Sequence, residues 1–277
     1  MKVRNYQRIV YEKGELSLSS PKGPALWLEA FKKNDHNDLN LKLVLAYLSG
    51  QTLTECWRLI ENQDNLLELD RLADWFVGVL RKMPLDDLVE GLRSEPYTLE
   101  ECISNVPQIS AFDADSLDLL VLLVKAGRPL SYSEIGYHLY PSNSQRNEIA
   151  RKKYGENAAK FAAILGLVEV ARGFENDPSA VMLVRPTRIG YAVERASGPR
   201  GDIVARLLFK LALFRDLVCT DQRSNCEKFI RTIELLSITT RCRRLSAFTW
   251  MLAVYRAHGG QLDSREKTES LLCQMRR

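Results

Sequence analysis

The chain has 277 residues, of which 45% are hydrophobic and 27% charged, so its composition excludes a disordered protein and predicts two or three folded domains. The longest apolar run, Leu117 to Val124, is interrupted by Asp118 and is far shorter than the ~20 residues that cross a bilayer. The net charge of +4 is unevenly distributed, because residues 1–140 hold 15 Lys and Arg against 21 Asp and Glu, net −6, whereas residues 141–277 hold 24 against 14, net +10.

The acidic half begins with residues that lack the apolar core and small-residue cleavage site of a signal peptide. We therefore expect a cytoplasmic, nucleoid-associated protein or a nuclear one, and no membrane contact. Alternation on both sides of Glu12-Lys13-Gly14 predicts a short hairpin over residues 6–18, and helices are predicted over residues 25–31, 39–48, 52–60 and 66–80. These elements form an N-terminal acidic helical domain at residues 1–111, which we expect to bind a partner protein.

Two helix starts in this domain have the capping-box pattern, Thr52-x-x-Glu55 and Thr98-x-x-Glu101. Apolar residues in the helix 66–80 recur every three or four positions and predict one buried face. That stripe is a core face. Its members are Leu66, Leu69, Leu72, Ala73, Phe76 and Leu80.

After a connection around Pro107, the pattern predicts a helix over residues 115–125 that ends at Gly127. Ser131-x-x-Glu134 is another capping box and opens a second helix that ends before Pro141. A third helix over residues 156–165 ends at Gly166. Two strands follow, residues 167–170 and 181–185, and the turn between them makes a hairpin.

This order of three helices and a hairpin resembles the winged helix-turn-helix superfamily. The resemblance also rests on Leu165-Gly166-Leu167-Val168, where the third helix meets the first strand, and on Thr187-Arg188-Ile189-Gly190, which follows the hairpin. It covers residues 115–193 and predicts a winged helix domain at residues 112–197. The fold class is therefore mainly α, with this domain flanked by the N-terminal helical domain and a C-terminal helical one.

The resemblance implies that the third helix enters the major groove of double-stranded DNA and that the hairpin touches phosphate or the minor groove. The basic connection 141–155 is longer than usual, so two alternatives stay open. Its cations begin the recognition helix, or they occupy a separate short helix and recognition belongs to residues 156–165. The candidate DNA-binding residues of this domain are Arg146, Arg151, Lys152, Lys153, Tyr154, Asn157, Lys160, Arg172, Arg185 and Arg188.

Turn residues at 197–201 begin a basic C-terminal helical domain, residues 198–277. A long apolar helix is predicted over residues 203–218, as a scaffold or as the contact of a homodimer. A helix over residues 229–236 and a cationic helix from residue 241 onward form a second helix-turn-helix or, alternatively, an ordinary amphipathic pair. On the cationic helix Leu245, Phe248 and Leu252 share an apolar face, and Arg241 and Arg244 are predicted to lie together on another face. The candidate DNA-binding residues of this helix are Arg241, Arg243 and Arg244.

Catalytic and metal-binding patterns are missing from the sequence. The six cysteines form no Cys-x-x-Cys pair, only three histidines occur, and neither a phosphate-binding loop nor a nucleophile elbow is found. We expect no metal, no cofactor and no enzymatic activity. The hypothesis is a non-catalytic double-stranded DNA-binding protein, either a regulator or a subunit of a larger complex. The alternative is a winged helix used for protein interaction in a chromosome-maintenance, replication or defence complex.

Overall fold

The computed structural model describes residues 37–49, 66–93, 107–109, 114–141, 147–172, 181–219 and 237–261. It is mainly helical, with one small three-stranded antiparallel sheet. The chain forms two compact units, Met1–Glu95 and Pro96–Arg277. Several predicted features lie outside the described residues: the hairpin 6–18, the helices 25–31, 52–60 and 229–236, the capping boxes at Thr52 and Thr98, and Arg146.

The first unit contains three described helices, α2 (Asn37–Leu48), α4 (Leu66–Lys82) and α5 (Leu85–Leu92). Helix α2 packs against both α4 and α5. The predicted stripe of α4 is buried from Leu69 to Leu80, and Phe76 meets the ring of Tyr47 edge to face with 4.9 Å between the ring centroids. Burial raises the pKa of Tyr47 well above its ordinary value.

Helix α5 follows α4 directly and was not predicted as a separate element. Pro84 starts it, and Asp86 and Asp87 lie in its first turn, where carboxylates stabilise the positive end of a helix. These paired carboxylates therefore mark a helix start. Leu85, Leu88 and Leu92 bury its apolar side.

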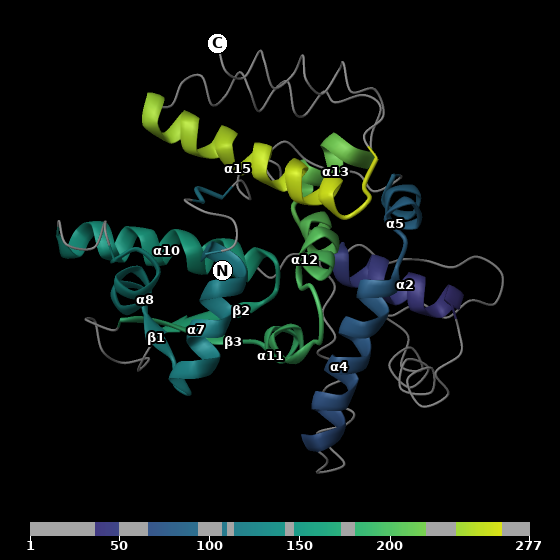
Figure 1. Ribbon diagram of the computed structural model, residues 1–277, viewed down its shortest axis with the longest axis horizontal. Helices are drawn as coiled ribbons and strands as arrows, with labels where there is room; N and C mark the ends of the chain where they lie inside the picture. The colour runs from purple at the N-terminus through teal and green to yellow at the C-terminus, as the bar shows by residue number, and fades with distance from the viewer. Residues whose placement is uncertain are drawn as a thin grey trace. The chain divides into compact units, whose positions relative to one another are not determined.

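The second unit begins with a helix–strand–helix–helix–hairpin order. The sheet order is β1 (Leu130–Ser131), β3 (Met182–Pro186) and β2 (Val168–Arg172), with both pairs antiparallel (Figure 1). In the central strand, Val184 is opposite Leu130 on one side and Val170 on the other. The predicted strands are thus present, each displaced by about one residue. The elements are η1 (Ala114–Asp118), α7 (Leu119–Ala126), β1 (Leu130–Ser131), α8 (Tyr132–Leu139), α10 (Glu148–Ile164), β2 (Val168–Arg172), β3 (Met182–Pro186) and α11 (Arg188–Arg195).

Local chemistry explains where α7 ends and α8 begins. Gly127 closes α7 in the left-handed region at φ 62°, where a side chain would be strained. Ser131 then caps α8, because its hydroxyl accepts from the amide of Glu134 while the Glu134 carboxylate accepts from the amide of Ser131 at 2.7 Å. The capping box predicted from sequence is confirmed. Arg128 also binds the Glu134 carboxylate at 2.6 Å.

The two sequence motifs at 165–168 and 187–190 meet in space. The Thr187 hydroxyl donates to the carbonyl of Gly166 at 2.7 Å and accepts from the amide of Gly190 at 2.9 Å, so it caps α11 and ties it to the end of α10. A Cβ on Gly190 would lie 2.0 Å from the carbonyl oxygen of Leu167, so only glycine fits. Both motifs therefore serve one junction between α10, β2 and α11.

Helices α8 and α10 cross with their backbones in contact. A Cβ on Gly136 would lie 2.0 Å from the carbonyl oxygen of Arg151, and one on Gly155 would lie 1.9 Å from that of Tyr132. Glycine at both positions removes the side chains that would hold the helices apart. This crossing determines which face of α10 turns outward.

The predicted long helix over residues 203–218 is wrong. It is divided into α12 (Gly201–Leu207), the 3-10 turn η2 (Leu208–Lys210) and α13 (Ala212–Cys219), with Leu211 extended between them. Ten of the sixteen residues in this stretch are apolar and buried, which is more than one face of a straight helix supplies. The break changes the direction of the chain, so that apolar side chains of both α12 and α13 are buried. Helix α15 (Ile238–Ala257) begins three residues before the predicted start at residue 241, with Ser237 as its N-cap, and it packs on α12.

Candidate nucleic-acid interface

Helix α10 is one continuous helix from Glu148 to Ile164, capped by the Asn147 side chain, which accepts from the amide of Ala150 at 2.7 Å. The cations at 151–153 and the segment 156–164 therefore belong to the same element. Of the two alternatives that the sequence left open, the structure agrees with the one in which the cations at 151–153 begin the same helix, and not with a separate short helix for them. Helix α10 also stands third in the order α7, α8, α10, the position of the predicted recognition helix.

The outward face of α10 is cationic. Its exposed side chains follow helical spacing and include Lys152, Lys153 and Lys160. Lys160 binds Glu156 with 2.5 Å between nitrogen and oxygen, and this hydrogen bond, with the charge of the lysines, lowers the pKa of Glu156. Lys152 and Lys153 form no salt bridge with any described residue. Both lysines are exposed to solvent, and their nearest named counter-charge is the Glu156 carboxylate, which is already bound to Lys160.

Arg151 lies apart from these lysines. Its guanidinium carbon is 5.3 Å from the ring centroid of Tyr137 on α8, a cation–π contact, and the side chain is half-buried. Tyr137 itself is 53% exposed and meets the ring of His138 edge to face. Arg151 therefore links α10 to α8 through Tyr137, whereas Lys152 and Lys153 point to the exposed face of α10.

Tyr154 and Asn157 occupy a half-buried flank of α10. The Tyr154 ring lies 5.1 Å from that of Tyr140, and the guanidinium carbon of Arg243 on α15 lies 6.0 Å from the Tyr154 ring centroid. Tyr154 is thus engaged on both sides. Sequence reasoning placed Tyr154 and Arg243 in two separate modules and had no signal for their contact.

The hairpin contributes fewer free charges than the sequence suggested. Arg185 binds Glu169, its cross-strand partner in the sheet register, with 2.6 Å between nitrogen and oxygen. Arg172 is exposed at the end of β2, and Arg188 is half-buried in the first turn of α11. The predicted turn between the strands, residues 173–180, lies outside the described residues.

The arginines of α15 are placed differently from the prediction. The buried face of this helix contains Phe248, Met251 and Tyr255, and Arg244 lies four residues before Phe248 on the same side. The expected separation of Arg244 from the apolar face is therefore wrong, because the buried face is broader than the stripe read from sequence. The Nε of Arg244 is buried without a hydrogen-bond partner in the structure.

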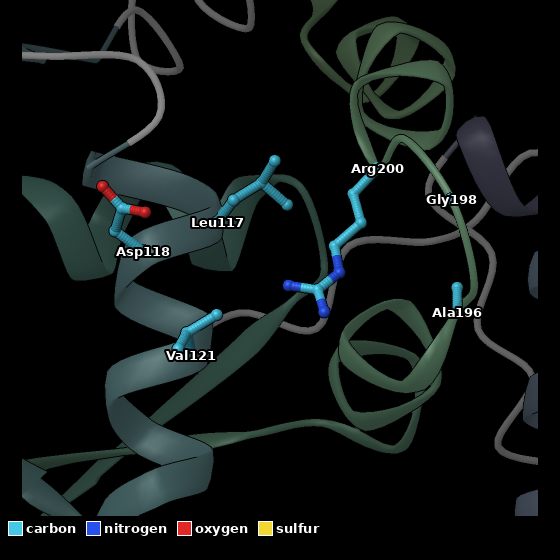
Figure 2. Close-up of a pocket in the computed structure, with 6 residues that line it drawn as sticks. All are labelled: Leu117, Asp118, Val121, Ala196, Gly198 and Arg200. Carbon is cyan, nitrogen blue, oxygen red and sulfur yellow. The ribbon is translucent and has the colours of Figure 1, made fainter.

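An open pocket of about 600 Å³ lies between the start of the second unit and the connection that follows α11. Figure 2 shows the Arg200 side chain reaching into it toward Leu117 and Val121, with the Asp118 carboxylate turned away. Arg200 donates to the Glu194 carbonyl at 2.7 Å and approaches its carboxylate at 3.7 Å. The cation that lines the pocket is therefore already committed within the chain.

Elsewhere in the C-terminal helices, burial lowers the pKa of Lys210 to about 7, and the neighbouring charge of Arg215 acts in the same direction. Among the described residues, no group of three or more His, Cys, Asp and Glu side chains is arranged to hold a metal ion. None of the helices that the structure describes combines the length and apolarity needed to cross a membrane.

No family model, curated protein or solved structure matches this chain.

Proposed function

We propose that residues 114–195 form a winged helix-turn-helix and that the protein is a non-catalytic double-stranded DNA-binding protein, a regulator or a subunit of a larger complex. The order of α7, β1, α8, α10 and the β2–β3 hairpin supports this proposal, as does the pairing of β1 with β3. In such a domain α10 is the helix that enters the major groove, and the hairpin is the wing.

The observation that carries the proposal is the outward face of α10. Lys152 and Lys153 are exposed there without salt-bridge partners among the described residues, and Lys160 forms a salt bridge with Glu156. DNA phosphates would supply counter-charges to these lysines, and each neutralised phosphate releases bound cations into solution. Catalysis would require a set of reactive side chains beside this surface, and DNA binding requires none.

The test is a salt-titrated mobility shift on a random duplex, comparing the wild type with Lys152→Gln/Lys153→Gln. If both lysines contact phosphate, the log-log salt slope of the variant falls by about 1.8, because each contact contributes about 0.9. The matched control is Lys82→Gln/Lys125→Gln, which removes two exposed lysines from the last turns of α4 and α7. The control should keep the wild-type slope. Absence of wild-type binding at low salt would overturn the proposal.

One observation favours the second candidate, a winged helix used for protein interaction. Ile149 is 79% exposed in the first turn of α10, beside the lysines, and a large exposed aliphatic side chain suits a protein contact better than a phosphate. In this function the acidic N-terminal domain serves the same partner or a second copy of the chain. If the wild type ignores DNA, Ile149→Asp should abolish a protein complex while leaving the fold intact.

A further inference from the structure

Helix α15 is held firmly at its C-terminal end. Tyr255 meets Phe209 and Phe214 edge to face, with ring centroids 5.9 and 5.5 Å apart. Beyond the last turn, the His258 Nδ1 lies 2.5 Å from a carboxylate oxygen of Asp202 at the start of α12. A Cβ on Gly201 would lie 2.4 Å from the His258 Nε2, so this ring fits closely over the backbone. The C-terminal half of α15 is therefore part of the core of the second unit.

The N-terminal half of α15 extends to α10. Figure 1 shows its yellow-green end on the side of α10 and its yellow end beside α12 and α13. The contact is the cation–π interaction between Arg243 and Tyr154, whose ring is supported from behind by Tyr140. The α15 arginines and the α10 lysines thus lie on two elements joined by a direct side-chain contact.

The arginines in this half of α15 have no counter-charge among the residues that the structure describes. Arg241, Arg243 and Arg244 occupy a single helical turn, and α15 contains no Asp or Glu. All three are partly buried, and none forms a salt bridge with a residue that the structure describes. Three neighbouring cations repel one another, and partial burial strengthens that repulsion. An anionic ligand would remove this cost.

The chemistry of these side chains selects phosphate. A guanidinium offers a planar fork of donors that matches two oxygens of one phosphate group. Several such groups along a helix match the repeated charges of a nucleic-acid backbone better than one small anion. Their position beside α10 places them next to the same duplex that Lys152 and Lys153 would contact.

We propose that the N-terminal half of α15 and the outward face of α10 form one composite surface that binds a single short stretch of duplex. This inference rests on the proposed function. Arg241, Arg243 and Arg244 bind backbone phosphates, and Tyr154 is a positioning residue that orients Arg243. The arrangement replaces the prediction of two separate readers, which would occupy sites about 34 Å apart, one turn of DNA. Directly packed helices lie about 10 Å apart, and one Arg–Tyr bridge adds much less than a turn of DNA.

The test measures affinity for duplexes of about 12 and about 24 base pairs, one and two turns, at several salt concentrations. Arg241→Gln/Arg243→Gln/Arg244→Gln should weaken binding on the order of 10- to 100-fold on both lengths, and lower the salt slope by about 2.7 on both, about 0.9 for each lost phosphate contact. The control is Arg256→Gln, an exposed arginine in the last turn of the same helix, with wild-type affinity expected. Far-UV circular dichroism verifies that each variant is folded.

The outcomes separate the two proposals. A loss confined to the longer duplex means that α15 is an independent reader and overturns the composite surface. An unchanged affinity of the arginine variant, while Lys152→Gln/Lys153→Gln loses affinity, removes α15 from the interface and leaves the proposed function standing. Failure of the wild type to bind either duplex overturns both.

The role of Tyr154 has its own readout. Tyr154→Phe keeps the ring face and should retain affinity, whereas Tyr154→Leu should lose about two- to fivefold, as expected for a cation–π contact. Combined with Arg243→Gln, Tyr154→Leu should add no further loss, because the two residues act through one contact. Full additivity, or equal losses in Tyr154→Phe and Tyr154→Leu, would contradict a positioning role.

Discussion

Replacing Gly155 with alanine should separate α8 from α10 and destabilise the second unit. The new Cβ would lie 1.9 Å from the carbonyl oxygen of Tyr132, whereas an unstrained contact needs about 3.5 Å. The obstacle is backbone, so a side-chain rotation does not relieve it. Overpacking of this kind costs about 3 kcal/mol, and the higher helix propensity of alanine offsets about 1 kcal/mol. We expect a net loss of about 2 kcal/mol in the free energy of unfolding.

Urea denaturation followed by circular dichroism measures this loss. Gly78→Ala is the matched control, since Gly78 lies inside α4 and a Cβ there meets no atom within 4 Å. The control should gain about 1 kcal/mol from helix propensity alone. If Gly155→Ala is as stable as Gly78→Ala relative to the wild type, the backbone contact between α8 and α10 does not exist as described.

Three further predictions concern stability. Burial lowers the pKa of Lys210 from 10.5 to about 7, so the cost of burying the charged amine is complete below pH 7 and declines up to pH 10.5. Lys210→Met should therefore raise the free energy of unfolding by about 1–3 kcal/mol at pH 6.5 and by little at pH 10.5. A gain that does not depend on pH would contradict this assignment. Ser131→Ala should lose about 1 kcal/mol in the free energy of unfolding, because it removes the N-cap of α8, and the control Ser133→Ala should lose nothing. The Arg128 hydrogen bond lowers the pKa of Glu134 to about 2, so the stability that this carboxylate contributes is complete above pH 4.5 and is lost toward pH 2. Acid titration of the wild type beside Glu134→Gln checks this. Thr187→Val should lose about 1–2 kcal/mol in thermal unfolding, since it leaves the Gly166 carbonyl and the Gly190 amide without their bonds, and an unchanged midpoint would refute that assignment.

The two proposals assign different tasks to two sets of cations, the lysines of α10 and the arginines of α15. On α10, Lys152 and Lys153 are exposed, which suits contacts in a groove whose sequence is read by shape and charge. On α15, the arginines are partly buried and Arg243 lies over the ring of Tyr154, which suits fixed phosphate contacts. Measuring both lysine and arginine variants on one duplex therefore distinguishes groove binding from backbone clamping.

Features that depend on a few neighbouring residues were predicted correctly. The Ser131–Glu134 capping box and the end of α7 at Gly127 follow from hydrogen bonds and backbone angles within one turn. The hairpin strands were found for the same reason, since alternation of apolar and polar side chains is a local signal. The cap and the turn require no knowledge of the rest of the chain.

Features that depend on what covers a residue were not predictable in this way. The stretch 203–218 is made of helix-forming residues throughout, and only the demand to bury it on several sides breaks it at Leu211. The sequence shows that Arg151, Lys152 and Lys153 are adjacent, but the crossing at Gly136 and Gly155 decides which of them face solvent.

The sequence by itself determined the order of helices and strands in the second unit and the concentration of positive charge in its half of the chain. Tertiary structure alone decided that α10 and α15 meet through Tyr154 and Arg243, residues separated by 89 positions. Local hydrogen bonds and periodicity are written in neighbouring residues, whereas a contact between distant segments depends on the packing of every element between them.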